Sequence, residues 1–358
     1  MRSYSIALIP GDGIGIDVIK EGKKVLDTLC SLDGGIKMDY RTFDWGCEYY
    51  LKTGRMMSET GLDELKDVDS IYLGAVGYPG VPDHVSLWGL LLPIRRKFEQ
   101  YINLRPVKLL RGIQSPLAGR TAEHLDFTVI RENNEGEYSS IGGRMYEGTE
   151  MDLAIQSAVF TKHGVERVLR YAYSMANKIG KPKRLTAATK SNGINHTMPF
   201  WDEYVRKINL EYPEVETEIT HIDALAAFFV TKPDVFDVVV ASNLFGDILT
   251  DLGAAIVGGM GIAPSANINP DRKFPSMFEP VHGSAPDIAG KGIANPTAAI
   301  WCAGMMLEHL GEHALANILM EALQQVLEEG RMVTPDLGGT ATTVQFGEEV
   351  CGKIKRLG

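Results

Sequence analysis

Two aspartates four residues apart, Asp247 and Asp251, stand in the otherwise apolar segment SNLFGDILTDLG (242–253). Side chains at positions i and i+4 of a helix are neighbours on its surface, and two like charges there repel each other. Burying both carboxylates among leucine, isoleucine and phenylalanine would cost far more free energy unless a positive charge compensated them. A bound cation would supply that charge, whereas a solvent-exposed helix stripe would need no ligand. The spacing by itself leaves both interpretations open.

A third carboxylate and two candidates for proton transfer occur elsewhere in the chain. Asp223 lies between the apolar runs of ITHIDALAAF (219–228), where an unpaired carboxylate would be costly. Together with the aspartate pair it offers three hard oxygen ligands, which suit Mg²⁺ or Mn²⁺ better than zinc. Tyr138 lies in a polar, glycine-containing loop, and Lys190 follows the strand-like run RLTAAT. Taken alone, these two residues could equally be a packing tyrosine and a solvent-exposed lysine.

Three arginines are candidates for binding an anionic ligand. Arg95 and Arg105 lie within PIRRKFEQYINLRPVKLL (93–110), and Arg131 lies within VIRENNEGEY (129–138). Guanidinium groups bind carboxylates through paired hydrogen bonds. Any one of these arginines fits a surface ion pair better than a ligand site. Three of them near the predicted ends of strands and helices, in so acidic a chain, favour an anionic ligand.

The overall composition limits the class of partner. The chain has 358 residues, of which 44% are hydrophobic and 23% charged, and its formal net charge is −10. This length allows two domains, and the acidic balance argues against nucleic acid or an anionic membrane as partner. Cys30, Cys47, Cys302 and Cys351 have no metal-ligand spacing, which predicts reduced thiols. We find no signal peptide and no membrane-spanning apolar segment, so we expect a cytoplasmic protein.

The elements that must position these residues alternate between strand and helix. Apolar runs predict strands over 5–10, 70–77, 126–133, 184–192 and 236–243. Amphipathic patterns predict helices, notably over 15–29 and 150–180. Such an alternation predicts an α/β fold with a largely parallel sheet. Most of the polar motifs follow strands, and the carboxyl ends of strands are where open α/β sheets bind ligands.

Two glycine-containing loops predict different things. PGDGIG (10–15) follows the first strand, but its third glycine precedes Ile16, which occupies the last position of the G-x-G-x-x-G fingerprint. We therefore reject a Rossmann dinucleotide site. FEPVHGSAPDIAGKGIANP (278–296) is poor in large side chains, so its backbone could approach a large planar ligand closely. Loops of this length within compact domains are usually functional.

These motifs occur together in one known family. The succession of GDGIG, R-x9-R, REN-x-EGEY, TKSN, SN followed by D-x3-D, and EPVHGSAPDIAGKGIANP resembles the β-decarboxylating dehydrogenases of isocitrate, 3-isopropylmalate, D-malate and tartrate, from residue 5 nearly to the end. The resemblance implies an isocitrate/isopropylmalate dehydrogenase-like α/β fold, with two domains around a cleft. It implies an NAD-binding domain over 1–102 and 261–358, and a substrate, metal and dimerisation domain over 103–260. It also implies a homodimer with shared active sites.

The same resemblance gives each candidate residue a role. The residues expected to hold a small dicarboxylate substrate are Arg95, Arg105 and Arg131. The expected ligands of Mg²⁺ or Mn²⁺ are Asp247, Asp251 and, from the partner subunit, Asp223. The expected catalytic groups are Tyr138 and, from the partner subunit, Lys190 and Asp223. The expected contacts to NAD are His282, Gly283, Ser284, Ala285, Asp287, Ile288 and Asn295. A monovalent cation such as K⁺ is a further candidate cofactor.

The reaction that the resemblance implies is the oxidative decarboxylation of D-malate or tartrate. The segment VPDHVSLWGLLLPIRR (81–96) most resembles that branch, because Trp88 stands where isopropylmalate enzymes usually have an acidic residue. Leu91 and Leu92 could line an isopropyl pocket, but they do not decide the substrate, because malate enzymes can carry leucines there too. The alternative substrate is 3-isopropylmalate. Isocitrate fits least well, because the serine and asparagine that grip its third carboxylate are absent from this segment.

The residue types alone are also compatible with two functions from other classes. A Mg²⁺-dependent phosphotransferase could use the same aspartates and arginines, but it would have no need for the loop over 278–296. A non-catalytic metal-binding protein would leave Tyr138 and Lys190 without a role.

Overall fold

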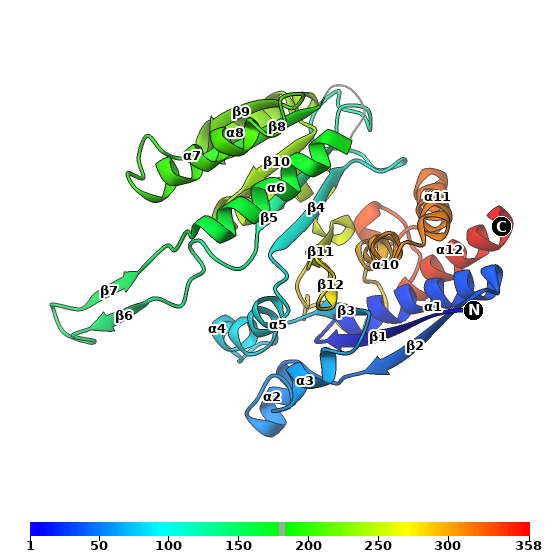
Figure 1. Ribbon diagram of the computed structural model, residues 1–358. Coiled ribbons are helices and arrows are strands. Elements are labelled where there is room, and N and C mark those ends of the chain that lie inside the picture. The colour runs from blue at the N-terminus through cyan, green and yellow to red at the C-terminus, as the bar shows by residue number, and fades with distance from the viewer. Residues whose placement is uncertain (179–182) are drawn as a thin grey trace. The chain divides into compact units, whose positions relative to one another are not determined.

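The computed structural model of the protein describes residues 1–178 and 183–358. The chain divides into two compact units (Figure 1). The first comprises Met1–Gln100, Leu109–Ala122 and Ala254–Gly358, and the second comprises Tyr101–Lys108 and Glu123–Gly253. Both units contain strands and helices, so the predicted α/β class is confirmed.

Five strands of the described chain form the sheet of the first unit. Their order is β2 (Ile36–Thr42), β1 (Arg2–Gly11), β3 (Ser70–Ala75), β12 (Ser276–Pro280) and β11 (Pro264–Ile268). The pairs from β2 to β12 are parallel, whereas β11 pairs antiparallel with β12. A Rossmann sheet has a different strand order, so the rejection of that fold is confirmed.

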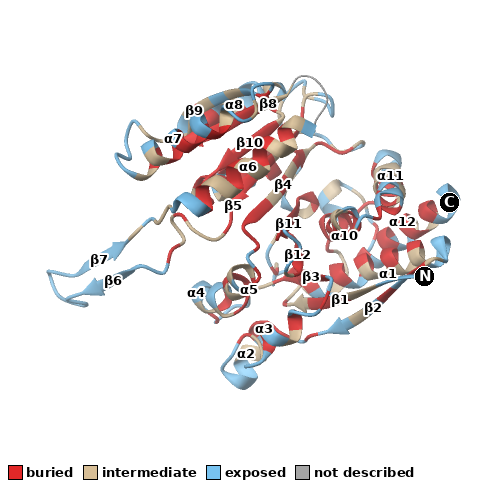
Figure 2. Ribbon diagram, in the orientation of Figure 1, coloured by how far each residue is buried: buried red, intermediate tan, exposed pale blue. Residues whose placement is uncertain are grey.

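Helices cover both faces of this sheet. On one face α1 (Gly15–Asp33) and α10 (Thr297–Leu310) contact the strands, and α11 (His313–Glu329) and α12 (Thr343–Leu357) pack against these two helices. The other face buries Ile9 and Leu73 against a cluster that includes Trp45, Leu65 and Phe98. The short helices on that side are α2 (Cys47–Thr53), α3 (Gly61–Leu65), α4 (Asp83–Ser86), the π-helical turn Leu87–Leu91 and α5 (Leu92–Lys97). Figure 2 shows the buried residues concentrated between these layers.

Two further features complete the first unit. Single 3-10 turns occupy Met260–Ile262 and Pro335–Leu337. The segment Leu109–Ala122 belongs to this unit, whereas the domain expected over 103–260 would have included it. Its contacts explain the difference: Arg111 donates to Glu321 of α11 over 2.8 Å, and a Cβ on Gly112 would lie 2.2 Å from the carbonyl oxygen of Leu327.

The second unit also contains five strands among its described residues. Their order is β4 (Ile102–Lys108), β5 (Asp126–Glu132), β10 (Val238–Ala241), β8 (Arg184–Thr189) and β9 (Glu216–His221). β4 and β5 are antiparallel, and the other pairs are parallel. The described helices of this unit are α6 (Lys162–Lys178), α7 (Thr197–Asn209), α8 (Ile222–Thr231), a 3-10 turn (Pro233–Val235) and α9 (Asn243–Ile256), of which the part up to Gly253 belongs to the unit. α9 follows β10 after a single residue, so it starts at the carboxyl end of that strand.

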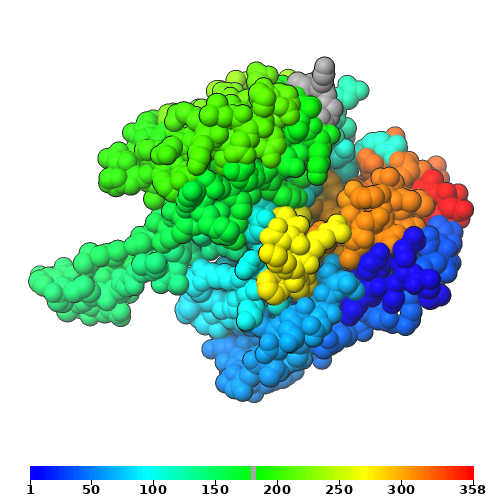
Figure 3. All heavy atoms as spheres, viewed as in Figure 1, coloured from blue at the N-terminus to red at the C-terminus, as the bar shows by residue number. Residues whose placement is uncertain are grey.

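A two-stranded arm projects from the second unit (Figures 1 and 3). It consists of β6 (Gly142–Met145) and β7 (Leu153–Gln156), which pair antiparallel. The helix predicted over 150–180 is therefore wrong for residues 150–161, since α6 begins only at Lys162. The last two residues of that prediction, 179 and 180, lie outside the described residues. Met151, Leu153 and Ile155 alternate along the arm and are 64%, 45% and 57% exposed. This period of two is typical of a strand.

No helix in the described parts of the chain combines the length and the apolar character needed to cross a membrane.

Candidate active site

Helix α9 carries Asp247 and Asp251 on one face, one turn apart. Their side chains are 33% and 51% exposed, so neither carboxylate is fully buried and neither is fully solvated. Partial burial raises the pKa of Asp251, and the nearby Arg105 acts in the opposite direction. The pair therefore forms a partly shielded site for positive charge rather than a solvated stripe.

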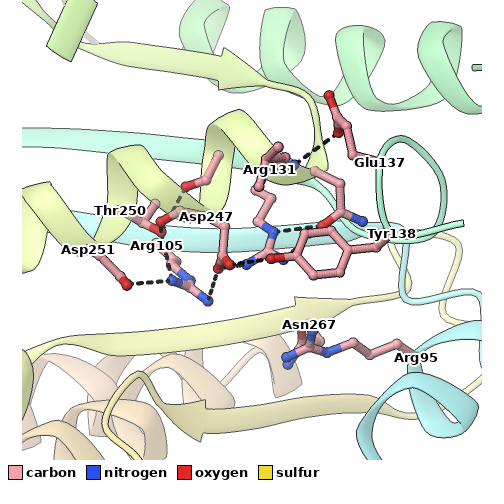
Figure 4. A network of polar contacts seen from close by, with 12 residues as sticks. Arg95, Arg105, Arg131, Glu137, Tyr138, Asp247, Thr250, Asp251 and Asn267 are labelled. Carbon is pink, nitrogen blue, oxygen red and sulfur yellow. Dashed lines mark hydrogen bonds and ion pairs between the residues drawn. The ribbon is translucent and has the colours of Figure 1, made fainter. Parts of the chain in front are cut away.

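Two buried arginines compensate these carboxylates in the structure (Figure 4). Arg105 extends from β4, with its Nη2 3.7 Å from Oδ1 of Asp247 and its Nη1 3.6 Å from Oδ1 of Asp251. Arg131, at the end of β5, forms an ion pair with Asp247 through its Nη1. Both side chains are at most a tenth exposed. The structure thus brings together two of the three predicted carboxylate-binding arginines with both predicted metal ligands of this helix.

Tyr138 lies in the same cluster. Its hydroxyl donates to Oδ2 of Asp247 over 2.7 Å, and its ring lies 5.4 Å from the guanidinium carbon of Arg131. Burial and, after it, the hydrogen bond to Asp247 raise the pKa of Tyr138. The phenol is therefore protonated near neutral pH.

Lys190 and Asp223 form a second, separate pair. Nζ of Lys190, just after β8, lies 2.9 Å from Oδ1 of Asp223, at the start of α8. The lysine lowers the pKa of Asp223. Within the described residues, no three acidic, histidine or cysteine side chains are grouped so that they could hold a metal. Within the described residues one chain therefore does not assemble the three predicted aspartate ligands, which agrees with the expectation that Asp223 comes from a second copy.

Arg95 belongs to the first unit. Its Nη2 donates to Oε1 of Glu279 over 2.6 Å, and the same oxygen accepts from Nδ2 of Asn267 over 2.7 Å. Arg95 and Glu279 are 11% and 8% exposed at their side chains. The guanidinium of Arg95 is thus held by its own unit, on α5.

The predicted cofactor contacts lie after β12, in the loop ahead of α10. Nδ1 of His282 is 2.9 Å from the carbonyl oxygen of Gly283, whereas its Nε2 is buried without a protein partner. Burial lowers the pKa of His282, so the imidazole is neutral near pH 7. The carbonyl of Ser284 accepts from the backbone N–H of Ile14 over 2.9 Å, and Asp287 is exposed. Ala285 has a positive φ of 40°.

Asn295 has a different environment from the rest of this loop. Its Oδ1 accepts from the N–H of Thr297 at the start of α10 over 2.9 Å, and its Nδ2 donates to Asp336 over 2.9 Å. The amide is buried. In this structure Asn295 connects the loop to α10 and to the 3-10 turn at Pro335–Leu337.

The PGDGIG loop has a structural role around Asp12. The buried carboxylate of Asp12 accepts from the N–H groups of Cys47 (2.8 Å), Glu48 (3.3 Å) and Gly77 (3.0 Å). Gly13 has a φ of 56°, and a Cβ there would lie 2.1 Å from the carbonyl oxygen of Ser284. The loop therefore caps α2 and packs tightly against the predicted cofactor segment.

Two polar residues that sequence reasoning missed hold the arginines of the site. Oδ1 of Asn243 accepts from Nε and Nη2 of Arg131 over 3.0 and 2.7 Å. Oγ1 of Thr250 accepts from Nη1 of Arg105 over 2.6 Å and donates to the carbonyl of Gly246 over 2.8 Å. Both residues lie on α9 beside the aspartates. The sequence signals them only indirectly: Asn243 belongs to the SN pair that precedes D-x3-D, and Thr250 stands directly before Asp251.

Comparison with known proteins adds an independent line of evidence. Residues 5–350 match the isocitrate/isopropylmalate dehydrogenase family. The chain is 52% identical over 358 residues to a protein named probable tartrate dehydrogenase/decarboxylase from Bacillus subtilis, with 100% of this chain and 99% of that one covered. It is 52% identical over 363 residues to a protein named D-malate dehydrogenase (decarboxylating) from Escherichia coli, with 99% and 100% covered.

Solved structures show the same fold. Isocitrate dehydrogenase from Methylococcus capsulatus superposes with a TM-score of 0.87 at 34% identity, covering 98% of this chain and 99% of that one. A β-decarboxylating dehydrogenase from Thermococcus kodakarensis superposes with a TM-score of 0.79 at 33% identity, covering 99% and 97%. The fold predicted from the sequence is confirmed.

Proposed function

The chain belongs to the isocitrate/isopropylmalate dehydrogenase family, and we propose that it catalyses the NAD-dependent oxidative decarboxylation of D-malate to pyruvate and CO₂, with tartrate as a further substrate. The observation that carries this proposal is the cluster of side chains from α9, β4, β5 and the loop that follows β5. A protonated phenol, two carboxylates and two guanidinium groups meet there within one unit. The names of the two relatives that are half identical over their whole length support the choice of diacid.

The side chains fit a divalent cation. Asp247 and Asp251 present hard carboxylate oxygens, which Mg²⁺ and Mn²⁺ prefer. In the structure the guanidinium groups of Arg105 and Arg131 lie against these carboxylates, so a bound cation would share or take over their role in compensating the negative charge. Asp223 of a second copy would provide the third carboxylate, which requires a homodimer.

The loop after β12 fits a dinucleotide. The unpartnered Nε2 of His282 is available to bond a polar group of the cofactor. Asp287 is exposed and could accept from a ribose 2′-hydroxyl. Its charge would repel a 2′-phosphate, so we propose NAD rather than NADP.

When bound, the cofactor and the cation would supply the chemistry that side chains lack, which is acceptance of the hydride and Lewis-acid polarisation of the substrate. Arg105 and Arg131, with Arg95, bind the carboxylates of the substrate and orient it. Lys190 of a second copy takes the proton of the hydroxyl group. After CO₂ has left, Tyr138 donates a proton to the carbon that carried it. D-malate and NAD⁺ thus give pyruvate, CO₂ and NADH.

The environment of the leucines supports D-malate or tartrate over 3-isopropylmalate. Leu91 is 8% exposed and packs in the core cluster of the first unit, and Leu92 is equally buried. Trp88 is 40% exposed and lies 4.7 Å from the guanidinium carbon of Arg96. An isopropyl pocket would need apolar side chains that are free to face the ligand.

Initial rates of NADH formation test the proposal. D-malate, tartrate, 3-isopropylmalate and isocitrate are compared at equal concentrations of Mn²⁺ and NAD⁺. We expect kcat/KM to be highest for D-malate or tartrate. A higher value for 3-isopropylmalate or isocitrate, or a preference for NADP⁺ with D-malate, would refute the assignment.

A further inference from the structure

The first turn of α9 is capped by a glutamate from another segment of the chain. Oε1 of Glu137 accepts from the hydroxyl of Ser242 over 3.0 Å, and its Oε2 accepts from the backbone N–H of Leu244 over 3.1 Å. The first N–H groups of a helix have no partner within the helix, and a negative charge is favourable at that end. Glu137 therefore fixes where α9 begins.

The same helical turn is joined to β5 and to the loop that follows it. Asn243, the first residue of α9, binds the guanidinium of Arg131 through Oδ1 and donates from Nδ2 to the carbonyl oxygen of Glu135 over 3.0 Å. A Cβ on Gly136, whose φ is 74°, would lie 3.1 Å from Cβ of Asn243. The loop and the helix thus touch along Gly136 and Glu137, immediately before Tyr138.

We infer that Glu137 is a positioning residue that sets the site's geometry by tying Tyr138 to the helix that carries Asp247 and Asp251. Glu137 is the neighbour of Tyr138 in sequence, and Asp247 lies one turn beyond the end that Glu137 caps. The 2.7 Å contact between Tyr138 and Asp247 depends on that register. This inference rests on the function proposed above, because it assigns Asp247 to the metal and Tyr138 to proton donation.

The chain offers a matched control two residues away. The carboxylate of Glu135 accepts from the N–H and the hydroxyl of Thr161 over 2.9 and 2.7 Å, just before α6. Glu135 thus supports the start of a helix as Glu137 does, but α6 carries none of the proposed site residues. Its side chain makes no contact with Asp247 or Tyr138 among the hydrogen bonds and ion pairs described for them.

The experiment compares Glu137→Met, Glu137→Gln and Glu135→Met in the full-length protein. Thermal unfolding, Mn²⁺ binding followed by electron paramagnetic resonance, and kcat and KM with D-malate are measured for each. We expect both methionine variants to lower Tm. Only Glu137→Met should weaken Mn²⁺ binding and reduce kcat, by about 10- to 100-fold, as for other residues that orient metal ligands. Glu137→Gln should recover most of both, because its amide oxygen still accepts from Leu244.

Two results would overturn the inference. One is wild-type Mn²⁺ affinity in Glu137→Met, and the other is an equal loss of affinity in both methionine variants. If the wild-type protein oxidised neither D-malate nor tartrate, the proposed function would fail separately. Amide hydrogen exchange over residues 243–249 would then test the positioning role of Glu137 independently of activity. Unchanged exchange there in Glu137→Met would overturn the positioning role, and faster exchange there, absent in Glu135→Met, would support it.

Discussion

Tyr138 and Lys190 occupy different surroundings, and their proposed roles differ accordingly. The phenol is half-buried, donates to Asp247 and has a raised pKa, so it retains its proton near neutral pH. Lys190, just after β8, forms an ion pair with Asp223, at the start of α8. The proposed proton donor of the second step, Tyr138, and the proposed proton acceptor of the first step, Lys190, are therefore separate groups.

Removing each group should produce a distinct loss. Tyr138→Phe keeps the ring, so Mn²⁺ and substrate binding should survive. It should still reduce oxaloacetate with NADH, while turnover of D-malate to pyruvate falls by about 10²- to 10⁴-fold, as expected for a lost acid–base group. Lys190→Met should lose both reactions. Steady-state kinetics in the two directions measure this. An equal loss of oxaloacetate reduction in the two variants would show that the proton-transfer roles are wrongly assigned.

The sequence predicted the charged residues of the site better than the neutral ones. Asp247 and Asp251 stand out because two carboxylates in an apolar helix need compensation, and Arg105 and Arg131 provide it in the structure. The contacts by which Asn243 and Thr250 hold those arginines could not be predicted. No sequence pattern shows which residue of a distant strand a short polar side chain in a helix will contact.

At the scale of elements, the site depends on how closely α9 packs against β5. A Cβ on Gly246 would lie 2.6 Å from Cβ of Arg131, so glycine allows the helix to approach the strand at the arginine itself. Gly253, seven residues further along the helix, is equally close to another strand: its Cβ would lie 2.6 Å from Cγ2 of Val107. Both glycines thus let α9 approach a strand equally closely, but only Gly246 does so at a residue of the site.

Gly246→Ala should therefore disturb both stability and substrate binding. We expect overpacking to cost about 1–3 kcal/mol of folding free energy and the displaced Arg131 to raise KM for D-malate. Gly253→Ala should lower stability to a similar extent but leave KM unchanged, because its neighbour is a valine outside the site. Denaturant unfolding and steady-state kinetics measure the two effects. A normal KM in Gly246→Ala would indicate that the approach of α9 does not position Arg131.

The elements themselves were predictable where apolar residues are buried. The strands expected over 70–77, 126–133, 184–192 and 236–243 all occur with slightly shorter bounds, since their side chains face a core. The helix expected from residue 150 was wrong, because the apolar residues of the arm alternate and remain exposed. A helix is predicted from periodic apolar residues on the assumption that these residues pack against a core. The apolar residues of the arm do not pack against a core of their own unit.

At the scale of the whole molecule, the chain passes between the two units more often than its sequence indicates. Leu109–Ala122 lies in the first unit, held to α11 by contacts of Arg111 and Gly112. Such long-range contacts leave no local pattern. The separation of Lys190 and Asp223 from the aspartate pair of the same chain is consistent with the proposed homodimer, in which each site takes these two residues from the second copy.

A hybrid dimer tests that arrangement. In a dimer of one Tyr138→Phe chain and one Lys190→Met chain, one site contains both substitutions and the other contains neither. Co-expression with two affinity tags yields the hybrid. We expect roughly half of the wild-type activity per dimer, although each parent homodimer is nearly inactive. Activity in the hybrid no higher than in the parents would place Tyr138 and Lys190 of one chain in the same site.

The central claim is that one metal-dependent site both oxidises and decarboxylates a diacid. Product stoichiometry tests it most directly: D-malate is incubated with NAD⁺ and Mn²⁺, and NADH, CO₂ and pyruvate are quantified before and after removal of the metal with EDTA. The account predicts equimolar formation of the three products, loss of all three with EDTA, and their recovery when Mn²⁺ is added back. NADH formed with oxaloacetate in place of pyruvate and CO₂, or unchanged turnover in EDTA, would contradict it.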